Sequence, residues 1–422
     1  MKIKDIKAYE LLDSRGNPTV GVEVFLSDES VGLALAPSGA STGKYEAIEK
    51  RDSQKDRYLG KGVLDAVNSI HNDILPLLRD KDASDLFGND LLMIEADGTD
   101  SKGNFGANAI LAVSLACAKA AASSMKINLH EYINNKASEF YDRKIEQNLP
   151  IPMLNILNGG AHADNPIDFQ EFMIRPYRFN SFSDSLRCGV EIFHTLKQTL
   201  EDKNLNTSVG DEGGFAPNLN TPESALDLIM ESIEKSGYKP GEEVNLCLDV
   251  AATEFCSDSI YKINGKGELN SNEMIDYLKV LKNSYPIYSI EDGLDEDDWQ
   301  GWKILTEELG SQTQLVGDDL FVTNTARIKR GIEESSANSV LIKVNQIGSL
   351  SETFQAIKLS EENNFKNIIS HRSGETEDAF ISDLSVGMGV GQIKTGAPSR
   401  SDRVAKYNRL LMIEKNSNIC FG

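Results

Sequence analysis

The stretch Ser339-Val340-Leu341-Ile342-Lys343-Val344-Asn345-Gln346 places a lysine directly after a short apolar run. The run is too short for an ordinary helix and has the β-branched composition of a buried strand. An ammonium group beside a buried strand must lie at its end, pair with an acid or take part in chemistry. We therefore predict a strand that ends at Lys343, and a catalytic base at Lys343 itself.

The same pattern recurs in the second half of the chain at intervals of roughly 25–40 residues, as in the βα units of a barrel. Each short apolar run ends in a charged or polar residue, and a helical pattern follows. The residues that end these runs are Asp249, Glu291, Asp318, Lys343, His371 and Lys394.

Helix signals lie between the predicted strands. Thr221-Pro222-Glu223 is typical of a helix start that Gly237 would end, and Ser349 with Glu352 forms a capping box. Strands that alternate with helices predict a parallel barrel, which carries its active site at the carboxyl ends of the strands. The alternative is an open doubly wound sheet, but Asn158-Gly159-Gly160 is a poor match to its glycine-rich phosphate loop, so we favour the barrel.

The first part of the chain has a different organisation. Val20, Val22 and Val24 alternate with polar or small residues, and Val31–Ala36 would pair with them in an antiparallel meander. Helical patterns follow at Val63–Leu78 and Ala107–Ala122. This mixture predicts an α+β domain.

The polar segment Asn134–Asn148 has no clear periodicity and is our predicted boundary between two domains. The predicted fold is therefore an α+β N-terminal domain over residues 1–138, followed by an α/β barrel of the TIM type over residues 139–422.

Composition narrows the functional classes. The formal net charge is −22, which disfavours binding to nucleic acid or to an anionic membrane. The five cysteines form no Cys-x-x-Cys pair, so neither a zinc site nor a disulfide framework is indicated. The N-terminal residues show no signal peptide, and we expect a cytoplasmic protein. Ala109–Ala122 is short and alanine-rich, so we expect a buried helix there and no membrane insertion.

Three of the run-ending residues are acids. Asp249, Glu291 and Asp318 would converge at the barrel mouth, where three carboxylates cannot all stay ionised without a cation. Oxygen ligands favour Mg²⁺ or Mn²⁺, although any single acid of the three could instead be a cap or a salt-bridge partner. The acids that follow, such as Asp292 and Asp319, are expected in solvated loops and helix starts.

The remaining run-ending residues bring positive charge. Lys343, Lys394 and the pair Arg372-Ser373 would form an anion site, and a guanidinium beside a hydroxyl suits a phosphate. Burial and neighbouring cations should lower the pKa of Lys343, so that it can act as a general base.

Three glycine-rich segments are candidates for the rest of the site. Asp211-Glu212 lies between glycines and would present a general acid, or is simply a turn. His162 follows Gly159-Gly160 and precedes Gln170-Glu171, although a lone histidine is more often structural. Pro37–Gly43 is a connector, or a lid over an anion or metal. Together these groups suggest proton abstraction beside a carboxylate, followed by loss of a leaving group.

With these motifs the chain resembles the enolases (phosphopyruvate hydratases) over nearly its whole length. The segments that carry the resemblance are Asp13–Thr19, Pro37–Gly43, Gly103–Ser114, Gly210–Asn218, Ser289–Trp299, Val316–Thr323, Leu341–Gly348, Ser370–Asp378 and Gly391–Gly396. The resemblance implies reversible dehydration of 2-phospho-D-glycerate to phosphoenolpyruvate with two Mg²⁺ ions, in glycolysis and gluconeogenesis. It also implies a barrel that opens with a ββαα unit.

The resemblance further implies a role for each matching residue. Lys343 would take the C2 proton and Glu212 would help the C3 hydroxyl leave. Asp249, Glu291 and Asp318 would hold the tighter Mg²⁺, and Ser41 would close over the second. Arg372 and Ser373 match phosphate contacts, Lys394 the carboxylate contact, and the pocket wall matches His162, Gln170, Glu171 and His371.

Enolases are homodimers or octamers, and the sequence does not decide between these. Two alternatives stay open: another acid-sugar dehydratase or racemase of the superfamily, and a non-catalytic structural or scaffold role. The first should lack the Ser41 loop and Arg372-Ser373, and the second would tolerate loss of Lys343 or Glu212.

Overall fold

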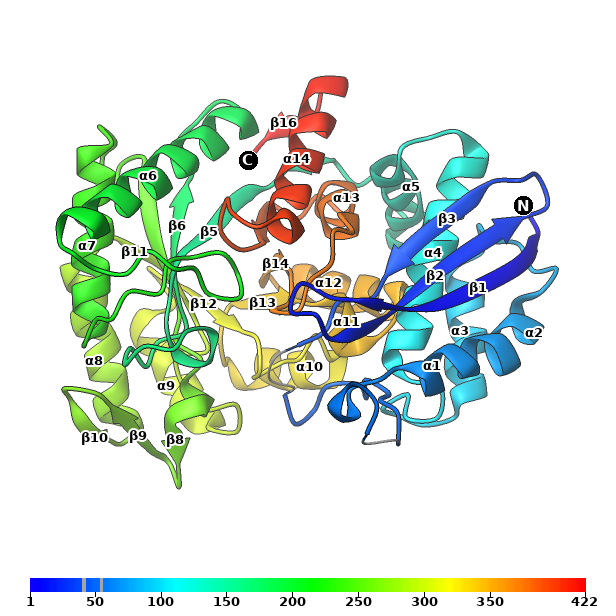
Figure 1. The fold of residues 1–422 in the computed structure, drawn as a ribbon. Coiled ribbons are helices and arrows are strands. Elements are labelled where there is room, and N and C mark those ends of the chain that lie inside the picture. The colour runs from blue at the N-terminus through cyan, green and yellow to red at the C-terminus, as the bar shows by residue number, and fades with distance from the viewer. Residues whose placement is uncertain (40–42, 54–55) are drawn as a thin grey trace.

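The structure, a computed structural model, describes residues 1–39, 43–53 and 56–422. It has two parts that lie side by side, a sheet with helices and a barrel (Figure 1). The sheet is antiparallel in the order β1–β2–β3, with bounds Ile3–Leu12, Pro18–Leu26 and Val31–Leu35. The predicted pairing is confirmed, since Val22 lies opposite Ala34 and Val24 opposite Gly32.

Helices cover one face of this sheet. They are α1 Leu64–Ser69, α2 Leu75–Leu78, α3 Leu86–Asp97, α4 Ala107–Met125 and α5 Leu129–Tyr141. The helix predicted over 63–78 is interrupted by a wider π turn at Ile70–Ile74. Helix α4 touches β3 so closely that a Cβ on Gly32 would lie 2.2 Å from the carbonyl oxygen of Ala116. Small residues on both sides allow this contact.

Helix α4 is longer than predicted. By length and composition alone it could cross a membrane, but 78% of its most apolar window is buried inside the protein. It is packed as the core helix of this part, which agrees with the expected buried helix. The predicted boundary at 138 lies within α5.

In the described part of the chain, eight strands close into a barrel in the order β11-β12-β13-β14-β15-β5-β6-β7. Their bounds are β5 Ile151–Asn158, β6 Glu171–Pro176, β7 Val244–Asp249, β11 Ile287–Glu291, β12 Gln314–Gly317, β13 Ser339–Ile342, β14 Lys366–Ser370 and β15 Gln392–Lys394. Every predicted run is therefore a barrel strand. The barrel is not wholly parallel, because β6 runs antiparallel to both β5 and β7.

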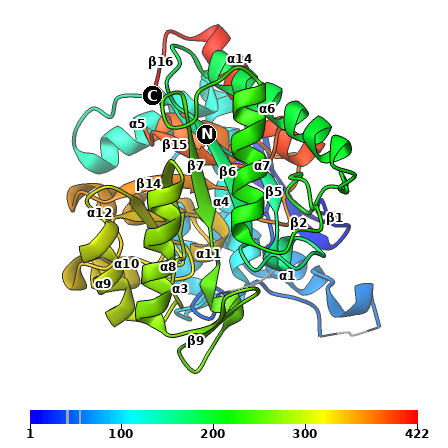
Figure 2. The same cartoon turned by 90° about the vertical axis from the view of Figure 1, so that its left-hand side faces the viewer.

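Helices surround the barrel (Figure 2). Their bounds are α6 Phe182–Asp202, α7 Pro222–Lys235, α8 Ser271–Ser284, α9 Trp299–Leu309, α10 Thr325–Glu334, α11 Val344–Ile347, α12 Leu350–Glu362, α13 Phe380–Gly387 and α14 Ser401–Asn416. The predicted helix starts are confirmed: Thr221 caps α7 and Ser349 caps α12 through their side-chain oxygens. Short strands β4 Asn148–Leu149 and β16 Cys420–Phe421 pair, and β8 Cys256–Ser257, β9 Ile260–Ile263 and β10 Gly267–Leu269 form a small separate sheet.

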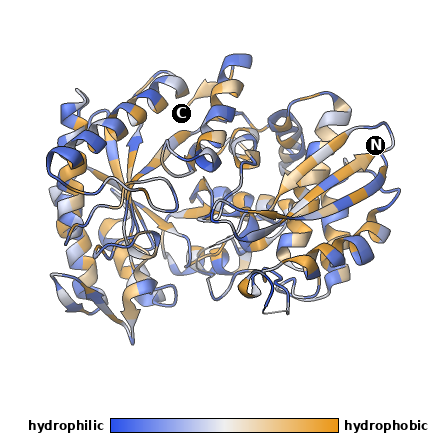
Figure 3. Cartoon of the chain, in the orientation of Figure 1, coloured by the Kyte–Doolittle hydropathy of each residue, from blue (hydrophilic) through white to orange (hydrophobic). Residues whose placement is uncertain are grey.

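The barrel interior is a packed core and not a channel. Side chains from several strands meet inside it, namely Met153, Met173, Cys247, Val316, Leu341 and Ile368, all at most 1% exposed. Figure 3 shows the barrel strands as mainly hydrophobic and the outer helix faces as mainly hydrophilic. This rigid core supports the side chains at the strand ends.

Polar contacts join the two parts of the molecule. The carboxylate of Asp90 in α3 accepts a hydrogen bond of 2.9 Å from the backbone nitrogen of Ser351, and Lys102 pairs with Glu352 at 2.9 Å. Burial raises the pKa of Asp90 to about 6. The first turn of α12 is thus tied to the N-terminal helices.

The raised pKa of Asp90 predicts a pH-dependent loss of stability. The folded protein holds this proton up to about pH 6, whereas the unfolded chain releases it near its ordinary pKa of 3.8. The stabilisation is complete below pH 3.8 and is lost as pH rises through 6, by about 2 kcal/mol between pH 4 and pH 7. Denaturant unfolding of Asp90→Asn across this range should show a shallower decline than the native protein; parallel declines would contradict the prediction.

Candidate active site

The predicted run-ending residues lie together at one end of the barrel. Asp249, Glu291 and Lys394 are the last residues of β7, β11 and β15, and Asp318, Lys343 and His371 directly follow β12, β13 and β14. All of them except Glu291 line one pocket of about 500 Å³, counting its open mouth, and Glu291 is fully buried. The pocket is also lined by the predicted residues His162, Gln170, Glu171, Glu212, Arg372 and Ser373. Ser41 lies outside the described residues.

Lys394 links a row of acids on three neighbouring strands. Glu171 pairs in register with Asp249, and Asp249 with Glu291. The Lys394 ammonium lies 3.2, 3.0 and 2.8 Å from the carboxylates of Glu171, Asp249 and Glu291 respectively. Burial alone would lower the pKa of Lys394. These acids have the larger, opposite effect, so the pKa of Lys394 lies well above its ordinary value.

The acids of this row are incompletely paired. Glu291 Oε2 and Glu171 Oε2 are buried and have no hydrogen-bond partner in the described part of the chain. Burial and the charge of Asp249 raise the pKa of Glu291 well above its ordinary value. The described pocket lining holds eight acidic side chains against three basic ones. Buried oxygens without donors and an excess of carboxylates suit a hard cation.

The three acids predicted as metal ligands are neighbours but do not form the tightest group. Among the described residues, potential ligand atoms within 4.8 Å of one another occur in His162–Glu171–Glu212 and in Asp292–Asp318–Asp319. Both carboxylate oxygens of Asp318 already accept hydrogen bonds: Lys343 donates to its Oδ2 and Gln346 donates to its Oδ1 at 2.9 Å.

Asp292 and Asp319 differ from the expected solvated acids. Asp292 is 4% exposed, and its carboxylate accepts hydrogen bonds of 2.9 and 2.8 Å from the backbone nitrogens of Asp318 and Asp319. Burial and the charge of Asp318 raise the pKa of Asp319 to about 8. The prediction was wrong for this pair, since the strand-end turn folds them into the pocket. Further along, Asp298 does cap α9, as expected of a helix start.

Lys343 contacts Asp318 directly, and its side chain is 15% exposed. Burial lowers the pKa of Lys343, and Arg372 and Lys394 lower it further, but the charge of Asp318 outweighs them and the net shift is upward. The predicted lowering is therefore wrong for the protein without a cation. The cause is a close carboxylate whose position the sequence does not reveal.

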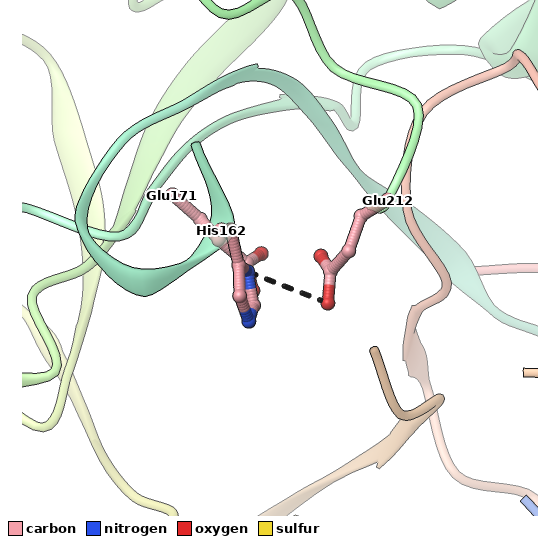
Figure 4. Close-up of side chains that lie close together, drawn as sticks. All are labelled: His162, Glu171 and Glu212. Atoms are coloured by element: carbon pink, nitrogen blue, oxygen red, sulfur yellow. Dashed lines mark ion pairs between the residues drawn. The ribbon is translucent and has the colours of Figure 1, made fainter. Parts of the chain in front are cut away.

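Glu212, Glu171 and His162 form a buried cluster (Figure 4). His162 Nδ1 lies 3.6 Å from an oxygen of each glutamate. Burial and the charge of Glu212 raise the pKa of Glu171 well above its ordinary value. Burial alone would raise the pKa of Glu212. The facing His371 and His162 have the larger, opposite effect, so the pKa of Glu212 lies well below its ordinary value. The pKa values of the two glutamates are thus shifted in opposite directions, and Glu171 is the more readily protonated of the pair.

The contacts of His371 determine which of its ring nitrogens carries the proton that faces Glu212. Burial lowers the pKa of His371 to about 3, so the ring is neutral near pH 7. Arg403, which is fully buried, donates to His371 Nδ1, and a guanidinium can only donate. The ring proton therefore lies on Nε2, 3.3 Å from Glu212 Oε2.

The turn that carries Glu212 requires glycine. Gly213 has φ of +87°, and a Cβ there would lie 2.7 Å from the carbonyl oxygen of Ser399. Asn155 donates to Glu212 Oε2 at 2.9 Å, and the backbone nitrogen of Ala397 binds the Glu212 carbonyl at 2.9 Å. The segment is a turn and also positions a carboxylate in the pocket.

Arg372 reaches across to the N-terminal part of the molecule. Its Nη1 donates to Glu46 Oε2 at 2.9 Å and to Asn345 Oδ1 at 3.2 Å. Ser373 lies beside it in the pocket wall. Gln170 donates to Asp249 Oδ2 at 3.3 Å on the other side of the pocket.

The sequence analysis missed several residues of this site: Glu46, Asn155, Gln346 and Arg403. Glu46 and Asn155 carry no local signal, because a polar residue in a loop or strand is common. Gln346 follows Lys343 by three residues. This is a helical spacing, and it could have suggested that the two side chains lie on the same side of the site. Arg403 lies on an otherwise ordinary amphipathic helix, and only the fold brings it to His371.

Models of known families match both parts of the chain. A model described as the N-terminal domain of enolase matches residues 3–133. A model described as the C-terminal TIM barrel domain of enolase matches residues 146–419. The two matches together cover nearly the whole chain.

Proposed function

Because the chain belongs to the enolase family, whose domains suggest a lyase of the dehydratase type, we propose that it catalyses the reversible dehydration of 2-phospho-D-glycerate to phosphoenolpyruvate. Lys343 is the general base at C2 and Glu212 the general acid at the C3 hydroxyl. The observation that carries this proposal is the placement of both groups in the wall of one pocket. They lie three strand positions apart around the barrel, Lys343 directly after β13 and Glu212 beside β5.

The base must be neutral before it can accept a proton. The carboxylate of Asp318 is the strongest influence that raises the pKa of Lys343. Neutralising that charge leaves burial, Arg372 and Lys394, all of which lower the pKa of Lys343. Gln346 holds Asp318 by its other oxygen and so keeps the pair in one geometry.

The acid must carry a proton when the hydroxyl leaves. The pKa of Glu212 is shifted below its ordinary value and that of Glu171, in the same cluster, above its own. Transfer of a proton from Glu171 to Glu212 within the cluster would prepare Glu212 for its role. The Nε2–H of His371 faces the same carboxylate and would orient it.

Mg²⁺ fits the acid-rich pocket, with Asp249, Glu291 and Asp318 as the proposed ligands of one ion and Ser41 as a proposed ligand of a second. When bound, the metal would stabilise negative charge that develops on the substrate carboxylate. Arg372 and Ser373 are the proposed phosphate contacts and Lys394 the carboxylate contact. Arg372 must then exchange part of its pairing with Glu46 for the phosphate.

The direct test is the ultraviolet absorbance of phosphoenolpyruvate formed from 2-phosphoglycerate with Mg²⁺ present. A rise that chelation abolishes supports the proposal. No rise, or a rise that survives chelation, contradicts it and favours another acid-sugar dehydratase or racemase, or a scaffold role. We also propose a cytoplasmic homo-oligomer, a dimer or an octamer, which a measurement of mass in solution would test.

Glu212→Gln should separate the two halves of the reaction. The amide keeps the size of the side chain but cannot donate a carboxyl proton, so dehydration should fall by about 10²-fold or more. Exchange of the C2 proton with solvent should continue, because Lys343 is unchanged. Exchange can be followed by NMR in deuterated water, with Glu333→Gln on the exposed face of α10 as the control. Equal loss of exchange and dehydration would show that Glu212 does not act at the leaving group.

A further inference from the structure

A second polar cavity lies at the opposite end of the barrel from the active site. It encloses about 990 Å³, counting its open mouth, and residues at the starts of β14 and β15 line it, with Arg175 of β6 and Tyr288 of β11. Because β6 is antiparallel, its last residues lie beside the first residues of β7, Pro176 opposite Val244. Arg175 is therefore at the amino-terminal floor of the barrel, whereas Glu171 on the same strand is at the catalytic end.

Arg175 is a buried cation with no acceptor. It is 7% exposed, and among the described residues its side chain makes no hydrogen bond and no ion pair; its Nε is fully enclosed. Its guanidinium stacks on the ring of Tyr288, with 4.1 Å from Cζ to the ring centroid. Stacking offsets part of the desolvation cost but supplies no hydrogen-bond acceptor, either to the enclosed Nε or to the Nη atoms. A buried guanidinium without an acceptor is suited to bind an anion.

The other groups of the floor cavity point to the same kind of ligand. The one acid in the described lining, Glu361, lies 3.8 Å from Arg143. Lys366 adds a second positive charge at the rim. In a chain of net charge −22 this cavity is therefore locally positive.

We propose that the floor cavity is a binding site for a small anion, a carboxylate or a phosphate, held by the guanidinium of Arg175. Two parallel hydrogen bonds from the guanidinium would bind the anion. The site is separate from the catalytic pocket, and it does not depend on which reaction that pocket catalyses.

The test compares Arg175→Met with the native protein. Methionine keeps an unbranched apolar stem against Tyr288 and removes the charge. Arg178→Met, three residues along and exposed, removes the same charge outside the cavity and is the control. Thermal unfolding and calorimetric titration are measured in sodium chloride, then with inorganic phosphate or L-malate at matched ionic strength. Anion binding near Arg372 is common to all three proteins and cancels in the comparison.

We expect phosphate or malate to raise the melting temperature of the native protein and of Arg178→Met, and Arg175→Met to bind that anion at least about tenfold more weakly. Whichever anion gives the larger difference identifies the ligand class. In chloride alone Arg175→Met should melt no lower than the native protein, because it loses an unpartnered buried charge. Equal binding by all three proteins, or a drop of more than about 3 °C for Arg175→Met in chloride, would overturn the proposal. Turnover should be unchanged in Arg175→Met.

Discussion

Lys343→Ala is expected to abolish exchange of the substrate C2 proton with solvent and to lower turnover by about 10³-fold or more. Unlike Glu212→Gln, it should stop both halves of the reaction, because proton removal comes first. Lys343 is the residue directly after β13, and its amine contacts the carboxylate of Asp318. Alanine leaves no group at this position that can accept a proton.

The loss must be separated from a change in folding. Lys343 is partly exposed to the pocket, and its backbone nitrogen is held by Thr323 at 2.9 Å, a contact that alanine keeps. Denaturant unfolding should therefore remain cooperative. Lys329→Ala, an exposed position on α10, is the matched control and should retain full turnover. If Lys343→Ala still exchanged the C2 proton at the native rate, the base would be another residue.

Glu291→Gln is expected to weaken Mg²⁺ binding by more than about 100-fold and to reduce turnover accordingly. Glu291 is fully buried at the end of β11, and one of its oxygens has no partner. Glutamine keeps the contact with Lys394 through its carbonyl oxygen but removes the charge. Calorimetric titration with Mg²⁺ alone, without substrate, measures the loss independently of catalysis.

The same variant should behave differently when metal is absent. The pKa of Glu291 is raised by burial and by Asp249, so the folded protein holds a proton that the unfolded chain releases. Metal-free native protein therefore loses stability as pH rises above about 4.5, and Glu291→Gln should lose less. Added Mg²⁺ should stabilise the native protein and Glu333→Gln, but not Glu291→Gln. Equal Mg²⁺ stabilisation of all three would place the metal elsewhere.

The strand ends could be predicted because their signal is local. A run such as Val340–Ile342 is buried on both faces of a barrel strand, so its composition alone marks it, and the first charged residue marks its end. The order of strands in a barrel then brings Asp249, Glu291 and Lys343 to one mouth. Strands β5 and β6 were not predicted from the sequence pattern, because the chain between them forms a loop and not the helix that follows each of the later strands.

Contacts between distant segments could not be predicted in this way. Glu46 lies 326 positions from Arg372, and Arg403 lies 32 positions from His371. The orientation of β6 likewise depends on its neighbours, and it alone places Arg175 at the floor of the barrel. None of these residues differs in local sequence from an ordinary surface polar residue.

The sequence by itself determined the two-part fold class and which side chains stand at the barrel mouth, because hydrophobic periodicity and strand order are properties of short segments. Only the tertiary structure decided how these side chains pair and ionise. The charge of Asp318 raises the pKa of Lys343, and burial with the charge of Glu212 raises the pKa of Glu171. Electrostatic interactions depend on distance and burial, which are set when residues far apart in the chain are brought together.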